Sequence, residues 1–126
     1  MGRSFPTWLG EYPMLESVTM GALVSALDGL AERQRAIADN VANLQTPGYH
    51  AKRVAFEAEL ARAVGEGSGT VTPTVARSLE PTRPDGNNVN LDTETLLNVD
   101  TNLRYQLATQ AVSVQFAELR AAMRTA

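Results

Sequence analysis

The chain has 126 residues, about one small domain, and its hydrophobic content of 44% is ordinary for a protein that folds. Its net charge of -3, with basic residues scattered along the chain, argues against nucleic acid as a partner. The absence of cysteine excludes disulfides, thiolate metal sites and cysteine nucleophiles.

Residues 1–17 are expected to form an N-terminal tail. The stretch carries Pro6 and Gly10 and lacks the uninterrupted apolar run of a cleavable signal peptide. The chain also lacks a run of about 18 apolar residues that could span a bilayer. We therefore expect a soluble chain, or one that leaves the cell without a cleaved signal.

Residues 18–45 are expected to form the first long helix. Large side chains recur there in steps of three and four, the spacing of a coiled-coil seam. Gln34 interrupts the seam, either to specify its register or as a tolerated polar residue. The apolar residues expected to pack are Leu23, Leu27, Leu30, Ile37, Val41 and Leu44.

A rigid turn follows this helix. Pro47 disfavours helical geometry at Thr46, so the helix should end near Leu44 or Gln45. Proline followed by Gly48 is the pattern of a type II turn, which would set Tyr49 beside the helix end. Asn40 and Asn43 share a face next to the seam, where their amides either hydrogen-bond the turn or a neighbouring chain, or are ordinary polar residues near a helix end.

Residues 46–90 are expected to hold the turn, a short helix or irregular arm, and a flexible loop. The glycines at 65, 67 and 69 indicate flexibility, since no phosphate-loop lysine follows them. The β-branched residues of 70–77 favour short strands, which Pro73 would restrict to an edge.

Residues 91–126 are expected to form the second long helix, capped between Asn90 and Asp92. Its apolar stripe shifts around the helix, which indicates more than one neighbour. The residues expected to pack against the first helix or other subunits are Leu96, Val99, Leu103, Leu107, Val112, Phe116, Leu119 and Met123. The expected fold class is therefore mainly α, an antiparallel hairpin or coiled coil of two long terminal helices with an irregular Gly/Pro-rich middle. So thin a hairpin usually needs association with other chains for stability.

The sequence offers little to an enzyme. His50 is the only histidine, and Glu57 and Glu59 are two residues apart, on different faces of a helix. We expect no catalytic residue, no metal, no cofactor and no small-molecule substrate.

The stretch from Arg33 to Tyr49, with its core Ala42-Asn-Leu-Gln-Thr-Pro-Gly-Tyr49, closely resembles the N-terminal signature of bacterial flagellar rod and hook proteins. The short length and the segments Asp85–Glu94 and Leu103–Gln106 are similar to the proximal rod subunits of that family. The resemblance covers roughly residues 20–60 and 85–123. His50 stands where the family leads us to expect lysine, and the 65–80 loop departs from the family pattern.

The resemblance implies a non-enzymatic subunit of the flagellar basal body, exported by the flagellar type III apparatus and assembled in the periplasmic space. The implied partners are other copies of itself, other rod proteins, and the MS ring with its adaptor protein. The N-terminal tail, which carries Trp8 and Tyr12, is expected to be an export signal, a subunit contact or a disordered segment. The alternatives are another rod protein of the family, or a soluble two-helix binding module or secretion chaperone.

Overall fold

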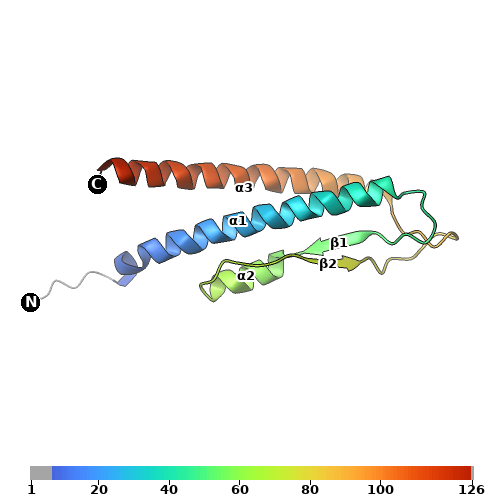
Figure 1. Ribbon diagram of the computed structural model, residues 1–126, viewed down its shortest axis with the longest axis horizontal. Coiled ribbons are helices and arrows are strands. Elements are labelled where there is room, and N and C mark those ends of the chain that lie inside the picture. The colour runs from blue at the N-terminus through green and yellow to red at the C-terminus, as the bar shows by residue number, and fades with distance from the viewer. Residues whose placement is uncertain (1–6, 126) are drawn as a thin grey trace, which may run out of the picture.

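The structure is a computed structural model that describes residues 7–125, with side chains described for 17–124. Two long helices, α1 (Thr7–Ala42) and α3 (Leu91–Thr125), run antiparallel along an elongated molecule (Figure 1). An arm, defined here as residues 51–80, lies along α1 (Figure 1), and it also contacts α3 through the ion pairs Arg53–Glu94 and Glu57–Arg104. The expected fold class is confirmed. No helix within residues 7–125 has an apolar stretch that could cross a bilayer.

The start of α1 differs from the expected tail. Helix begins at Thr7, so most of the expected tail 1–17 is helical, and residues 1–6 lie outside the described part. The reason is that an existing helix extends readily, since each added residue brings its own hydrogen bond. Trp8 and Tyr12 fall in this added length, where side chains are not described.

The end of α1 lies close to the expected position. The α-helix ends at Ala42, and the next turn tightens, because the Leu44 N–H donates to the Val41 carbonyl at 3.2 Å. The chain then enters the Thr46–Tyr49 turn. Tyr49 N–H donates to the Thr46 carbonyl at 3.2 Å, and Gly48 has a φ of 74°, which together are the marks of a type II turn.

The α3 helix begins where its cap was expected. The Asn90 side-chain oxygen accepts hydrogen bonds from the Asp92 and Thr93 N–H groups at 2.9 and 3.2 Å. Asp92 and Glu94 place negative charge in the first turn, next to the positive end of the helix dipole.

The arm contains more regular structure than the sequence indicated. Strand β1 (Lys52–Ala55) is followed by helix α2 (Glu57–Gly65) and strand β2 (Thr74–Arg77). The strands pair antiparallel, with Lys52 opposite Arg77 and Ala55 opposite Thr74. β1 lies against α1, and β2, all four residues of which are exposed, forms the outer strand.

Small residues on α1 let the arm approach closely. The Phe56 ring lies over Gly29, where an added Cβ would come within 2.5 Å of the ring. The Arg33 guanidinium covers the same ring at 4.9 Å from its centroid. One turn closer to the start of α1 than Gly29, the Ser25 hydroxyl donates to the Gly69 carbonyl at 3.0 Å.

Gly69 corrects the expectation that the glycines of 65–69 serve flexibility alone. It is buried, and a Cβ there would meet the Val18 carbonyl oxygen at 2.7 Å. Its φ of 70° adds a second reason for glycine. The reason for the difference is tertiary, since α1 lies directly against this turn. Gly65 and Gly67 have open space where a Cβ would stand.

The buried apolar core is small and lies between α1 and the arm. Its centre is formed by Leu30 and Ala36 from α1 and by Val54 and Phe56 from the arm. Ala108 of α3 packs against this cluster and is only partly buried. Most of α3 beyond this point therefore has little cover from the rest of the chain.

Candidate functional site: the signature junction and the exposed helix faces

Asn40 is the centre of the signature junction, where α1, the turn, β1 and α3 meet. Its side chain is fully buried, and its amide nitrogen donates to the Lys52 carbonyl at 3.0 Å and to Glu94 Oε2 at 3.1 Å. Its oxygen accepts from the Lys52 N–H at 2.8 Å and the Tyr49 hydroxyl at 3.4 Å. All four hydrogen-bonding positions of the amide are therefore used.

Glu94 brings a buried charge to this junction. Its carboxylate has no exposed surface, and Oε1 accepts a hydrogen bond from Arg53 Nη1 at 2.7 Å. A buried carboxylate is tolerated only when it is paired and hydrogen-bonded, and Arg53 and Asn40 supply these contacts. Glu94 therefore joins α3 to both α1 and β1.

Asn87 satisfies the carbonyl groups left open at the end of α1. Its amide nitrogen donates to the carbonyls of Asn43, Leu44 and Thr46 at 2.9, 3.2 and 2.8 Å. Arg83 adds a 2.6 Å hydrogen bond from Nη2 to the Leu44 carbonyl. Helix ends need such donors because their last carbonyls have no partner within the helix.

Asn88, the next residue, anchors the arm. Its oxygen accepts from the Ala51 N–H at 2.7 Å, and its nitrogen donates to the Ser78 and Glu80 carbonyls, each at 3.1 Å. Like Asn87, Asn88 is buried and serves the backbone of distant segments. The Asp85–Glu94 segment singled out in the sequence thus packs directly against the turn.

The remaining signature residues are placed around this junction. Asn43 is half-buried, and its oxygen accepts a hydrogen bond from the Thr46 hydroxyl at 3.0 Å. Thr46, Pro47 and Gly48 are exposed, while Tyr49 is half-buried against Asn40. Gly48 donates its N–H to the Asp85 carbonyl at 2.8 Å, so the two loops are in contact. The asparagine amides hydrogen-bond the turn, as in one of the two readings of the sequence.

Two ion pairs beside the junction have perturbed pKa values. Arg33 donates to both carboxylate oxygens of Glu57 at 2.7 Å and holds the pKa of that carboxyl below its usual range, although partial burial acts in the opposite direction. Asp39 accepts a 3.0 Å hydrogen bond from the Lys52 ammonium, which raises the lysine pKa.

The apolar residues expected on α1 occupy three environments. Leu30 and Ile37 are buried, while Leu23, Leu27 and Leu44 are half-buried. Val41 is exposed. The middle of the expected seam is thus covered within the chain.

The apolar residues expected on α3 are mostly exposed. Many of the buried or half-buried positions of α3 hold polar or small residues, among them Glu94, Thr101, Ala108 and Gln115, and Leu97, which was not among the expected residues, is half-buried as well. Of the expected set, Val112 is half-buried. The others are exposed: Leu96, Val99, Leu103, Leu107, Phe116, Leu119 and Met123.

Sequence reasoning missed Glu94 and Arg53 as a buried pair, and it missed Phe56 on Gly29. Gly29 was the available signal, since a glycine inside a helical pattern often marks a close approach. No local signal pairs Arg53 with a glutamate on another element. Among the described residues, no group of histidine, aspartate and glutamate side chains is arranged to hold a metal ion.

Comparisons with known proteins agree with the signature. The family model described as "Flagella basal body rod protein" matches residues 20–50. Over 112 residues, the chain is 33% identical to the flagellar basal body rod protein FlgB of Escherichia coli (strain K12), covering 71% of this chain and 81% of that protein. It is 31% identical over 121 residues to FlgB of Cereibacter sphaeroides, covering 83% and 93%.

A shorter match is stronger in identity. Over 38 residues the chain is 55% identical to FlgB of Borrelia hermsii, covering 30% of this chain and 28% of that protein. The resemblance noted in the sequence is thus confirmed by relatives that align over most of both chains. This chain belongs to the FlgB family of flagellar basal body rod proteins.

Proposed function

We propose that this chain is a structural subunit of the flagellar basal body rod, in its proximal part, and that it assembles through the exposed apolar faces of its terminal helices. The observation that carries the assembly surface is the α3 stripe, defined as Leu96, Val99, Leu103 and Leu107. These side chains are 71%, 53%, 57% and 70% exposed. Family membership supports the structural role.

The α3 stripe has the geometry of a helix-packing surface. Its residues follow one another in steps of three and four, which aligns them along one side of a helix. The buried residues Glu94 and Thr101 lie on the other side, toward the rest of the chain. Burying a leucine side chain contributes about 1.5–3 kcal/mol, so a neighbour that covers the stripe gains several kcal/mol. A surface of this kind is typical of an interaction site.

A second apolar stretch continues toward the end of α3. Phe116, Leu119 and Met123 are 51%, 48% and 68% exposed, in continuation of the half-buried Val112. We assign this stretch to contacts with other subunits as well. On α1, the expected packing of Leu23, Leu27 and their seam neighbours serves the subunit itself.

The signature junction sets the angles between the α1 end, the arm and α3, and we propose that the arm and α3 meet neighbouring subunits. Asn40, Asn87 and Glu94 fix the α1 end, the arm and α3 to one another by hydrogen bonds and one ion pair. Its proposed role is orientation, so that the α3 stripe and the arm face fixed directions. This role requires no catalysis, cofactor or metal.

The export route, the location and the partners are proposed on the basis of family membership. The subunit would be exported by the flagellar type III apparatus without a cleaved signal peptide, and would join the rod in the periplasmic space. Its partners would be other copies of itself, other rod proteins, and the MS ring through an adaptor protein. A soluble binding module or secretion chaperone would instead remain in the cytoplasm, which cell fractionation distinguishes.

The test is a charge placed within the α3 stripe. Leu103→Glu and Leu107→Glu should leave the purified chain as helical as the wild type, because both side chains are exposed. In cells that carry either variant as the only copy, electron microscopy should show basal bodies without rods, because a buried unpaired charge costs several kcal/mol.

The matched control is Asn98→Glu, which adds the same charge to an exposed α3 residue outside the stripe. It should support rods and motility. Normal rods in the Leu103→Glu and Leu107→Glu strains would contradict the assignment of the stripe. Intact rods in cells that lack the chain altogether would contradict the rod function itself.

A further inference from the structure

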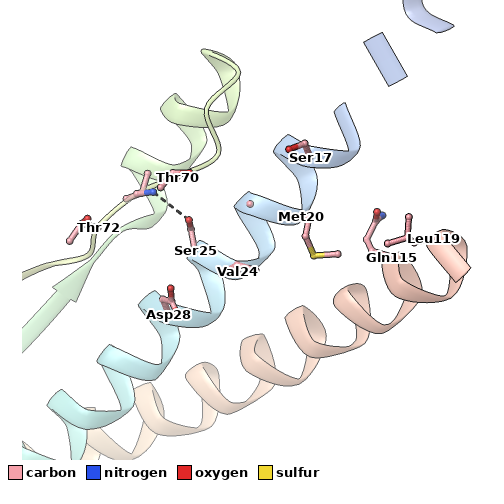
Figure 2. Close-up of a pocket in the computed structure, with 11 residues that line it drawn as sticks. Ser17, Met20, Val24, Ser25, Asp28, Thr70, Thr72, Gln115 and Leu119 are labelled. Carbon is pink, nitrogen blue, oxygen red and sulfur yellow. Dashed lines mark hydrogen bonds between the residues drawn. The ribbon is translucent and has the colours of Figure 1, made fainter. Parts of the chain in front are cut away.

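We propose that Arg77 and Leu79 of one copy dock into a groove on α1 of a second copy. The groove runs over α1 between the arm and the last turns of α3, and has a volume of about 720 Å³ (Figure 2). Its lining includes Met20, Val24 and Asp28 of α1, Val71 of the arm and Leu119 of α3. The inference deepens the proposed rod function and rests on it, because it names which surfaces of two copies meet.

Leu79 is the apolar knob of this contact. It is 97% exposed, whereas Ser78 before it is buried. Arg77 is exposed as well, and this alternation is that of an extended chain, so Arg77 and Leu79 project to the same side. Covering the Leu79 side chain in a contact would contribute about 1.5–3 kcal/mol.

The backbone that carries Leu79 is held in place. Ser78 N–H donates to the Ala51 carbonyl at 2.7 Å, and the Asn88 amide binds the carbonyls on either side of Leu79, at Ser78 and Glu80. A knob on a fixed backbone loses little conformational entropy on binding. This separates Leu79 from an apolar residue on a mobile loop.

The groove offers both apolar and acidic side chains to Arg77 and Leu79. Gly21 and Ser25 lie on the α1 side of it, and the apolar Met20, Val24 and Leu119 surround them. Figure 2 shows Met20 on α1 directed toward Gln115 and Leu119 on α3, with Asp28 farther along α1 toward the arm's strands. The groove therefore has an apolar end at Met20 and an acidic end at Asp28.

The charges on the two surfaces are complementary. Arg77 faces Asp28, which lines the groove, in the proposed contact. Neither of these two charged side chains forms an ion pair or side-chain hydrogen bond within the part of the chain that the structure describes. The contact would give each of them an opposite charge.

The spacing of the two surfaces also agrees. Two residues of extended chain from Arg77 to Leu79 span about 7 Å. On α1, the four residues from Val24 to Asp28 span about 6 Å. With Arg77 at Asp28, Leu79 therefore lies over Val24.

The contact must join two copies, because the knob and the groove lie on different parts of one molecule. The groove lies toward the end where α1 begins and α3 ends, and the knob follows β2 toward the opposite end (Figure 1). Two different surfaces that bind each other form a heterologous contact, which repeats from copy to copy. Such a contact suits an open, rod-like assembly.

The natural absence of cysteine allows a direct test by disulfide formation between copies. Full-length Leu79→Cys and Val24→Cys chains are mixed under mild oxidation, and products are separated without reductant. The mixed pair should yield several times more cross-linked dimer than either variant alone. Leu79→Cys mixed with Gln106→Cys, an exposed position outside the groove, is the matched control.

Charge reversal then tests the pairing. Adding Arg77→Asp to the Leu79→Cys chain should lower the yield roughly fivefold, since an attraction becomes a repulsion. Adding Asp28→Arg to the Val24→Cys chain should restore the yield of cross-linked dimer. Arg124→Asp, an exposed arginine beyond the contact, should leave the yield unchanged.

The outcomes separate this inference from the rod function. If Leu79→Cys couples to Gln106→Cys as well as to Val24→Cys, or if Asp28→Arg restores nothing, the inference is overturned. The rod function then still stands where Leu103→Glu abolishes rods. Intact rods in cells without the chain overturn the function, whatever the disulfide yields.

Discussion

Replacing the side-chain amide of Asn40 with a carboxylate, in Asn40→Asp, should destabilise the whole subunit. In the wild type the amide nitrogen donates to the Lys52 carbonyl at 3.0 Å and to Glu94 Oε2 at 3.1 Å, and the variant loses both hydrogen bonds. Each buried acceptor left without a donor costs about 1–3 kcal/mol. The new carboxylate also faces that of Glu94 where neither side chain is exposed. The expected loss in free energy of unfolding is about 3–6 kcal/mol, a large part of the ~5–15 kcal/mol typical of a domain.

Urea unfolding of the full-length chain, followed by far-UV circular dichroism, measures this loss. With a slope of about 2 kcal/mol per molar urea, the midpoint should fall by roughly 1.5–3 M. The matched control is Asn43→Asp, the same change three residues later in a half-buried side chain. There the lost hydrogen bond is the 2.8 Å one to the Asp39 carbonyl within the same helix end, so its midpoint should move by less than about 0.5 M. Equal shifts for the two variants would refute the assignment of Asn40 as the centre of the junction.

Two further predictions concern the contact between α1 and the arm. Gly29→Ala should lower the melting temperature, because the gain in helix propensity of about 1 kcal/mol is outweighed by a Cβ 2.5 Å from the Phe56 ring, a clash of about 1–3 kcal/mol. Gly65→Ala, with open space around its Cβ, should not lower it, and equal losses in both variants would contradict the packing argument. Arg33 lowers the pKa of Glu57, so this pair stabilises the fold above about pH 4.3 and loses that effect as the pH falls through the lowered pKa. Glu57→Gln should therefore flatten the acid limb of the stability–pH curve by less than about 1 kcal/mol, since the carboxylate is 44% exposed; an unchanged acid limb would argue against the pair.

Local chemistry made parts of the structure predictable. The start of α3 follows from Asn90, whose side chain caps the first N–H groups, and the end of α1 follows from Pro47. The type II turn follows from the order of Pro47 and Gly48. Each of these signals acts within a few residues, so the local sequence is enough to predict the structural feature.

The partners of α3 were harder to foresee. Periodicity favours leucines for a helix interface, but the structure turns Leu96 and Leu103 outward and buries Glu94 and Thr101. Burial of Glu94 depends on Arg53, which reaches it from the arm, 41 residues away along the chain. A helical pattern contains no information about a partner so distant in sequence.

The pairing of α1 with α3 also sets an order for folding. The hydrogen bonds that join them connect residues far apart in sequence, with separations of 54 for Asn40 and Glu94 and 68 for Gln34 and Asn102. At about 5–20 residues per second, synthesis of the 54 residues after Asn40 takes about 3–11 s, during which α1 has no α3 to contact. Closing so long a loop also costs entropy before any contact repays it. The newly made subunit therefore passes through an interval in which α1 has been made but the junction cannot yet close.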